Sequence, residues 1–214
     1  MSHVRFDILA IGSLAANPYW GEKTPVRNEY ATCTLVRSGD VTLVVDPGWP
    51  AEVLRSALFY RAGLEPEAVT HVFLTHFDPA HFSGIDLFDG AAWLMFEEEI
   101  RYARAEGDAE GLSGQVIKRA RPAPETFATG VGLFPTFGPS PGHCSLLVCT
   151  AVQTTVVAGD IVLARDHFER GRLEAEPWDL AKARESFRDV IEIADLVVPG
   201  HDNVLVCRAG GGLA

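Results

Sequence analysis

Residues 75–84 have the sequence THFDPAHFSG and directly follow an apolar run at residues 72–74. Two histidines, His76 and His81, therefore lie five residues apart on a short turn that ends in Gly84. Strand ends that open into loops often carry the chemistry of α/β proteins, because the strand is rigid while the loop is accessible. We expect this segment to lie at a functional site.

Three later segments repeat this arrangement of an apolar run, a glycine and a polar side chain. They are Pro141-Gly142-His143, Ala158-Gly159-Asp160 and Pro199-Gly200-His201-Asp202. Imidazole nitrogen and carboxylate oxygen are ligands that zinc and iron(II) accept. The four segments together predict one metal site that is assembled from four loops.

The residues of these loops resemble the metallo-β-lactamase-fold superfamily, whose first metal motif is His-x-His-x-Asp-His. The resemblance extends from about Ile8 to Asp202 and implies a single domain over residues 1–214. It also implies an α+β fold, a four-layer αβ/βα sandwich, whereas the sequence pattern alone predicts only mixed α and β structure. The residues that match the metal ligands of the family are His76, His81, His143, Asp160 and His201.

The resemblance also implies a division of roles among these ligands. His76 and His143 would belong to a first metal position and His81 and His201 to a second, while Asp160 would bridge the two or serve whichever one is filled. The cofactor expected from it is zinc, as one or two ions, or alternatively iron.

Two positions of the first motif depart from the family. Asp78 stands where the second histidine is expected, and Ala80 stands where the aspartate is expected. Asp78 is retained as a candidate metal ligand, and Asp78 and Asp160 are candidates for orienting the attacking water. Ala80 cannot bind a metal, so we expect a weaker second position and an altered mechanism.

The leading functional interpretation is a metal-dependent hydrolase of a small ester, thioester, lactone or amide, because bound metal ions activate water. One alternative is an oxidoreductase similar to the persulfide dioxygenases of the same superfamily. In those enzymes two histidines and one aspartate hold a single iron, and His76, His143 and Asp160 would serve here. Another alternative is a non-catalytic, metal-binding member of the family.

Composition limits the classes of partner. The net charge of −11 argues against a nucleic-acid surface, which needs clustered Lys and Arg. No signal-peptide core and no apolar stretch of 18 residues is visible, so we expect a soluble cytoplasmic protein that does not bind membranes. A small-molecule substrate is expected, and a homo-oligomer is left open. The four cysteines form no Cys-x-x-Cys pair, which favours buried free thiols.

The pattern of strand and helix formers divides the chain into two halves rich in β-structure, each followed by helices. Residues 107–124 are punctuated by Gly and Pro, and their structure is left undecided. His71 and His167 match no family position and are expected in the core or on the surface. Asp46 is expected to orient a loop or a histidine near the site. Strands are predicted at residues 5–11, 31–37, 41–46, 69–75, 91–96, 127–137, 145–151, 154–159 and 195–199, and helices at residues 51–62, from 97 and at 177–194.

Overall fold

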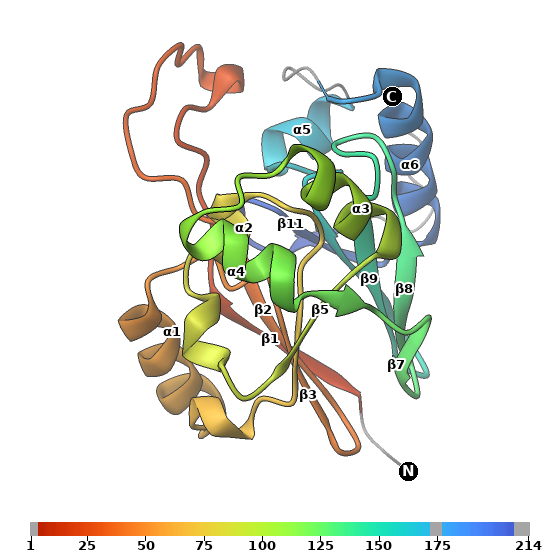
Figure 1. Cartoon of the computed structure of the whole chain (residues 1–214). Coiled ribbons are helices and arrows are strands. Elements are labelled where there is room, and N and C mark those ends of the chain that lie inside the picture. Colours follow the sequence, from red (N-terminus) through yellow and green to blue (C-terminus); the bar gives the residue numbers. More distant parts are fainter. Residues whose placement is uncertain (1–3, 172–176, 208–214) are drawn as a thin grey trace.

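The computed structural model describes residues 4–171 and 177–207, and these form two six-stranded sheets (Figure 1). The strands of each sheet follow one another in chain order. The first sheet contains β1 (Arg5–Ala10), β2 (Cys33–Ser38), β3 (Val41–Val45), β4 (His71–Phe73), β5 (Ala92–Met95) and β6 (Arg121–Pro122). The second contains β7 (Thr126–Ala128), β8 (Val131–Pro135), β9 (Cys144–Cys149), β10 (Thr154–Gly159), β11 (Leu196–Pro199) and β12 (Leu205–Val206).

Helices cover the outer face of each sheet, and the two inner faces pack on each other. The helices are α1 (Ala51–Ala57), α2 (Pro79–Phe82), α3 (Glu97–Glu106), α4 (Gly111–Arg119), α5 (Arg165–Arg170) and α6 (Leu180–Ile193). Leu54 of α1, Ile100 of α3 and Val116 of α4 share one core with the first sheet. Phe187 and Val190 of α6 share another core with the second sheet. The predicted αβ/βα sandwich is therefore confirmed.

Alternation along the strands produces the separate cores. Successive side chains of a strand point to opposite faces. In β3, Val44 faces the helices, while its neighbours Leu43 and Val45 face the second sheet. In β4, Val72 and Phe73 divide in the same way. Both faces are buried over Leu43–Val45 of β3 and Val72–Phe73 of β4, which explains why these residues are apolar without a polar alternate, whereas Thr42 and His71 before them are half-buried.

Three local predictions need correction. The segment predicted as one strand at residues 127–137 is a hairpin of β7 and β8, because Gly130 adopts the left-handed conformation at φ +76°. The segment left undecided at residues 107–124 contains α4. The strand predicted at residues 69–75 is shorter, since only His71–Phe73 pair with both neighbouring strands.

The parallel pairs of each sheet bring the loops of the site together. β3 runs parallel to β4, with Val45 opposite Phe73, and β10 runs parallel to β11, with Gly159 opposite Pro199. The carboxyl ends of parallel strands lie at the same edge of a sheet. The loop from Asp46, the motif at residues 75–84 and the loops of Asp160 and His201 therefore start beside one another.

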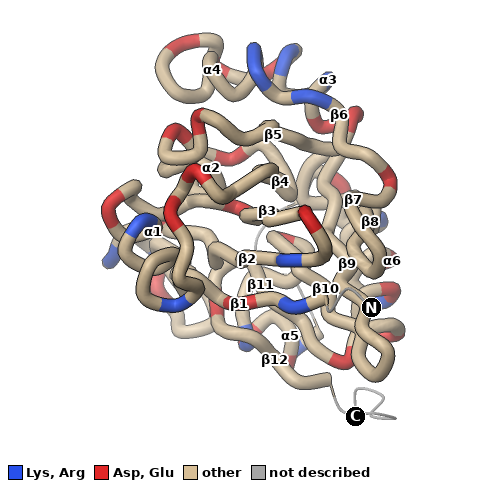
Figure 2. The backbone as a smooth tube through the Cα atoms, turned by 90° about the horizontal axis from the view of Figure 1, so that it is seen from below, with Lys and Arg blue, Asp and Glu red and all other residues tan. Residues whose placement is uncertain are grey.

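Acidic residues lie at several places around the outline of the molecule (Figure 2).

All four cysteines are free; Cys33 and Cys144 are buried and the other two half-buried. Burial raises the pKa of the Cys144 thiol to about 12, so its position beside His143 does not make it a thiolate. Within the described residues, every helix is too short or too polar to cross a bilayer.

Candidate metal site

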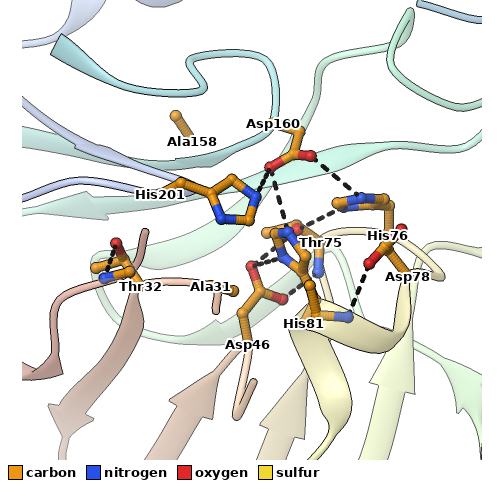
Figure 3. A network of polar contacts seen from close by, with 12 residues as sticks. Ala31, Thr32, Asp46, Thr75, His76, Asp78, His81, Ala158, Asp160 and His201 are labelled. Carbon is orange, nitrogen blue, oxygen red and sulfur yellow. Dashed lines mark hydrogen bonds and ion pairs between the residues drawn. The ribbon is translucent and has the colours of Figure 1, made fainter. Parts of the chain in front are cut away.

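The carboxylate of Asp160 is the centre of the site. Its Oδ1 lies 3.2 Å from Nε2 of His81 and 3.2 Å from Nε2 of His201. Its Oδ2 lies 3.6 Å from Nε2 of His76. Figure 3 shows Asp160 between the rings of His201 and His76, with His81 beneath it. One oxygen thus faces the two histidines predicted for the second position, and the other faces His76 of the predicted first position.

All four imidazoles have the Nδ1 atom close to a polar atom of the surrounding protein. Nδ1 of His76 lies 3.1 Å from the Thr75 hydroxyl, and that of His81 lies 3.0 Å from Oδ2 of Asp46, an ion-pair contact without hydrogen-bond alignment. Nδ1 of His143 and of His201 lie 2.9 Å from the carbonyl oxygens of Thr136 and Tyr30, respectively. An outer partner of this kind fixes the ring and leaves the Nε2 atom as the ligand.

His143 differs from the other three histidines in what its Nε2 atom does. That nitrogen accepts a hydrogen bond of 3.1 Å from the backbone N–H of Asp160. The ring nonetheless lies in the site, 5.3 Å from the His76 ring between centroids. Because its Nδ1 faces a carbonyl oxygen, His143 is held as the neutral tautomer with the proton on Nδ1.

The burial and charge of the site shift the pKa values in opposite directions. Burial lowers the pKa of His81, but the carboxylates of Asp160 and Asp46 outweigh it and hold the pKa well above its ordinary value. Burial raises the pKa of Asp160, but His201 and His81 outweigh it and hold the pKa well below its ordinary value. Burial lowers the pKa of His143 to about 3. These shifts favour protonated His81 and His201 beside an ionised Asp160.

The donor set fits a metal ion. Ligand atoms of His76, His81 and Asp160 all lie within 4.8 Å of one another. Nε2 of His81 and Oδ1 of Asp160 are buried, yet neither makes a hydrogen bond to any described residue, and their 3.2 Å contact lacks hydrogen-bond alignment. Buried polar atoms without partners are costly. A divalent cation between imidazole and carboxylate would satisfy them.

Asp46 is built into the site more firmly than its sequence position suggested. It is 1% exposed and adopts φ +50°, a conformation that Asp and Asn tolerate better than most residues. Its carboxylate accepts hydrogen bonds from the backbone N–H and the hydroxyl of Thr75, at 2.9 and 2.8 Å. The same carboxylate contacts His81. Asp46 therefore links Thr75 to the ring of His81, in agreement with its predicted role of orienting a loop or a histidine near the site.

Substitution of Asp46 by asparagine tests this role. Asparagine accepts the same backbone conformation and one Thr75 hydrogen bond, but it cannot offer a carboxylate to Nδ1 of His81. We expect metal affinity to fall about 10- to 100-fold, the usual cost of losing such an outer partner. Competition with a chromogenic chelator measures the affinity. Asp195→Asn is the control and should leave affinity unchanged, because Asp195 precedes β11 and, among the described residues, its carboxylate accepts only from the N–H of Thr154 at the start of β10.

Asp78 begins α2 and caps it. Its Oδ1 accepts a 2.8 Å hydrogen bond from the backbone N–H of Ala80. Its charge acts on His76, raising the pKa of that ring against the larger lowering effect of burial. Ala80 makes a backbone contact instead, because its carbonyl accepts from the N–H of Ala31. Asp78 remains a predicted ligand, with one oxygen engaged in the cap.

Asp78→Asn separates capping from metal binding. Asparagine is as good a helix cap as aspartate, so the stability of the metal-free protein should stay within about 0.5 kcal/mol, whereas Asp78→Ala should lose about 1 kcal/mol. If Asp78 binds the metal, both variants lose affinity together. Chelator competition combined with urea unfolding gives both quantities, and unchanged metal affinity in Asp78→Asn would remove this residue from the ligand set.

Glu99 is the residue that the sequence did not reveal. It lies in the first turn of α3 beside Glu97 and Glu98 and is fully buried. Its Oε1 accepts from the N–H of Phe77 at 2.8 Å, and its Oε2 accepts from the hydroxyl of Ser140 and the N–H of Gly142 at 2.7 and 3.0 Å. It therefore ties the first motif to the loop of His143.

Comparison with known proteins identifies the family of the chain. The family model described as the metallo-beta-lactamase superfamily matches residues 26–201. The human metallo-beta-lactamase domain-containing protein 1 is 32% identical over 74% of this chain and 57% of its own length, and the Xenopus laevis protein of that name is 30% identical over 78% and 69%. This chain thus spans little more than half of the human relative.

A solved structure extends the agreement to the fold. A Thermotoga maritima protein described as a metallo-beta-lactamase superposes with a TM-score of 0.71 at 20% identity, covering 95% of this chain and 99% of that one. AidC, described as a dizinc quorum-quenching lactonase, gives 0.69 at 15% identity, over 85% and 77%. These similarities establish the fold, while the family match covers the four site loops. The chain belongs to the metallo-beta-lactamase superfamily.

Proposed function

We propose that this protein is a metal-dependent hydrolase of a small ester, thioester, lactone or amide. The observation that carries the proposal is the carboxylate of Asp160, which faces His76 with one oxygen and His81 and His201 with the other. Hydrolases among the proteins of similar fold, such as the dizinc lactonase, give it further support.

The residues suited to hold the metal are those of the sequence prediction. His76 and His143 serve the first position, His81 and His201 the second, and Asp160 lies between them. A bound zinc or iron ion would lower the pKa of its water towards ~7 and polarise a substrate carbonyl. Asp78, which uses only Oδ1 in capping α2 among the described contacts, is proposed as a ligand and as the group that orients the attacking water.

The reaction needs no other reactant than water. The acyl–oxygen bond of the ester breaks, the water oxygen joins the acyl carbon, and the protons pass to the leaving alkoxide and to solvent or a carboxylate. The buried walls around Asp160 keep its charge unscreened, which strengthens its interaction with a proton or a cation. His143, held neutral by Thr136, contributes a ligand without adding charge.

Metal removal tests the proposal. We expect protein purified without added metal to contain one or two equivalents of zinc and to hydrolyse simple 4-nitrophenyl esters. Dialysis against a chelator should abolish hydrolysis, and zinc should restore it. Elemental analysis and absorbance at the 4-nitrophenolate band give both readings.

Two other results would replace this proposal. About one equivalent of iron together with oxygen uptake on a persulfide would identify a dioxygenase that uses His76, His143 and Asp160. Absence of bound metal, with no activity that responds to chelators, would favour a protein that acts by binding.

A further inference from the structure

A pocket of about 400 Å³ adjoins the candidate metal site and is lined by residues of α5 and α6. These two helices are labelled in Figure 1. Asp160 and Ile161 line it from the loop after β10, and His167 lines it from α5. Because Asp160 belongs both to this pocket and to the candidate metal site, a molecule bound in the pocket would lie beside a candidate metal ligand. The pocket is large enough for a small acyl compound.

One wall of the pocket is apolar. Leu180, Ala183 and Phe187 of α6 line it, at positions three and four residues apart that share one face of the helix. The Phe187 ring lies flat against the ring of His167, with a centroid distance of 4.8 Å. Tyr19 stacks on His167 at 6.4 Å. This wall suits a hydrocarbon chain.

His167 supplies a polar atom within this apolar surrounding. The ring is 4% exposed, and its Nδ1 accepts a hydrogen bond of 3.2 Å from the N–H of Leu163. The proton of the neutral ring therefore resides on Nε2. Burial lowers the pKa of His167 to about 4, in keeping with a neutral ring. No described residue accepts from Nε2, so this donor is available to a ligand carbonyl.

Two arginines of α6 also line the pocket. Arg184 and Arg188 are one helical turn apart, are exposed, and therefore lie at the mouth. Neither forms an ion pair with a carboxylate of the described residues, whereas Arg27, Arg37, Arg101 and Arg119 all do so. Nε of Arg188 donates to the carbonyl oxygen of Arg184 at 3.2 Å. Among the described residues of a chain of net charge −11, these two guanidinium groups without a carboxylate partner are suited to bind an anion at the pocket mouth.

We propose that the pocket selects substrates that carry a carboxylate at the end of a short apolar chain. Arg184 and Arg188 bind the carboxylate at the mouth, and His167 donates from Nε2 to the carbonyl at the inner end, beside Asp160. The inference rests on the proposed hydrolase function and adds the substrate class to it. Charge-assisted bonds from guanidinium to carboxylate supply the selectivity.

Binding of two ketones that cannot be hydrolysed tests the pocket without turnover. The ligands are 5-oxohexanoate and 2-heptanone, which share the carbonyl and differ in the terminal carboxylate. The zinc-loaded full chain is titrated with each, and side-chain and amide NMR shifts of His167 and α6 give the dissociation constants. We expect 5-oxohexanoate to bind at least about tenfold more tightly, as charge-assisted bonds imply.

Substitutions separate the two ends of the pocket. In the double variant Arg184→Gln and Arg188→Gln, the preference for the anion should vanish while 2-heptanone binds as before. Lys182→Gln, a cation of the same helix that contacts Trp178 and does not line the pocket, is the control and should retain the preference. His167→Phe keeps an aromatic ring and should weaken both ligands alike, roughly 2- to 12-fold for one lost hydrogen bond.

The outcomes distinguish this inference from the proposed function. Equal binding of the two ketones, no binding of either, or a preference that survives the double arginine variant overturns the pocket inference. Hydrolysis is measured separately with 4-nitrophenyl butyrate and the mono-4-nitrophenyl ester of glutarate. A binding preference without hydrolysis of either ester would count against the hydrolase and leave the pocket assignment in place.

Discussion

Asp160→Asn is expected to eliminate metal-dependent hydrolysis while leaving the protein folded. The amide has the same shape as the carboxylate but lacks the charge that faces His76, His81 and His201. Loss of an outer partner of a metal ligand costs about 10- to 100-fold in affinity or activity, and loss of the proposed central ligand should exceed that range. We therefore expect kcat/KM to fall by more than about 100-fold.

Metal analysis and ester hydrolysis on the same preparation measure this effect. Asp202→Asn is the matched control, because Asp202 follows the candidate ligand His201 but, within the described part of the chain, its carboxylate accepts only from the backbone N–H groups of Arg165 and Asn203. It should retain metal and activity. If Asp160→Asn kept both its metal content and its rate, Asp160 would not be a ligand, and the bridging arrangement would have to be abandoned.

Glu99→Ala is expected to destabilise the metal-free protein by about 3–5 kcal/mol, since two buried donors, at Ser140 and Gly142, and the part-buried N–H of Phe77 lose their acceptor at once. The Phe77 and Gly142 N–H groups lie in the loops that carry His76 and His143. Metal affinity should therefore fall as well. Urea unfolding monitored by circular dichroism gives the free energy, and chelator competition gives the affinity.

The same helical turn provides the controls for this prediction. Glu97 and Glu98 form only exposed ion pairs with Arg101, at 2.5 and 3.2 Å, and pairs of this kind contribute less than about 1 kcal/mol. Their alanine variants should be nearly as stable as the parent. Glu99→Gln retains one acceptor oxygen and should fall between. A loss in Glu99→Ala no larger than in Glu98→Ala would show that the carboxylate does not hold the loops.

The sequence identified the loops of the site because their signal is local. Each ligand follows an apolar strand and a turn, and parallel pairing of β3 with β4 and of β10 with β11 brings those ends together. Asp46 was recognisable for the same reason, since it ends a strand in a turn. The prediction of the layered fold rested on the family resemblance, because the pattern of apolar residues alone predicts only mixed α and β structure.

Residues whose role depends on distant partners were not recognisable. Glu99 looks like Glu97 and Glu98 in a helix first turn that favours acid, and only folding brings it to Ser140, 41 residues away. His167 resembled an ordinary core histidine, and it is one; its place beside Asp160 depends on how α5 packs against α6. The turn at Gly130 was missed because the apolar pattern continues on both sides of it, and the left-handed conformation of a glycine is not visible in that pattern.

The candidate ligands are divided between the two sheets, and this division couples the site to the interior that the sheets share. His76 and His81 follow β4, while His143, Asp160 and His201 belong to loops at the ends of β8, β10 and β11. Phe73 of the first sheet and Val157 of the second belong to that shared interior. We expect a volume change there to shift the candidate ligands of one sheet relative to those of the other. Metal affinity should therefore respond to substitutions in that interior more strongly than stability does.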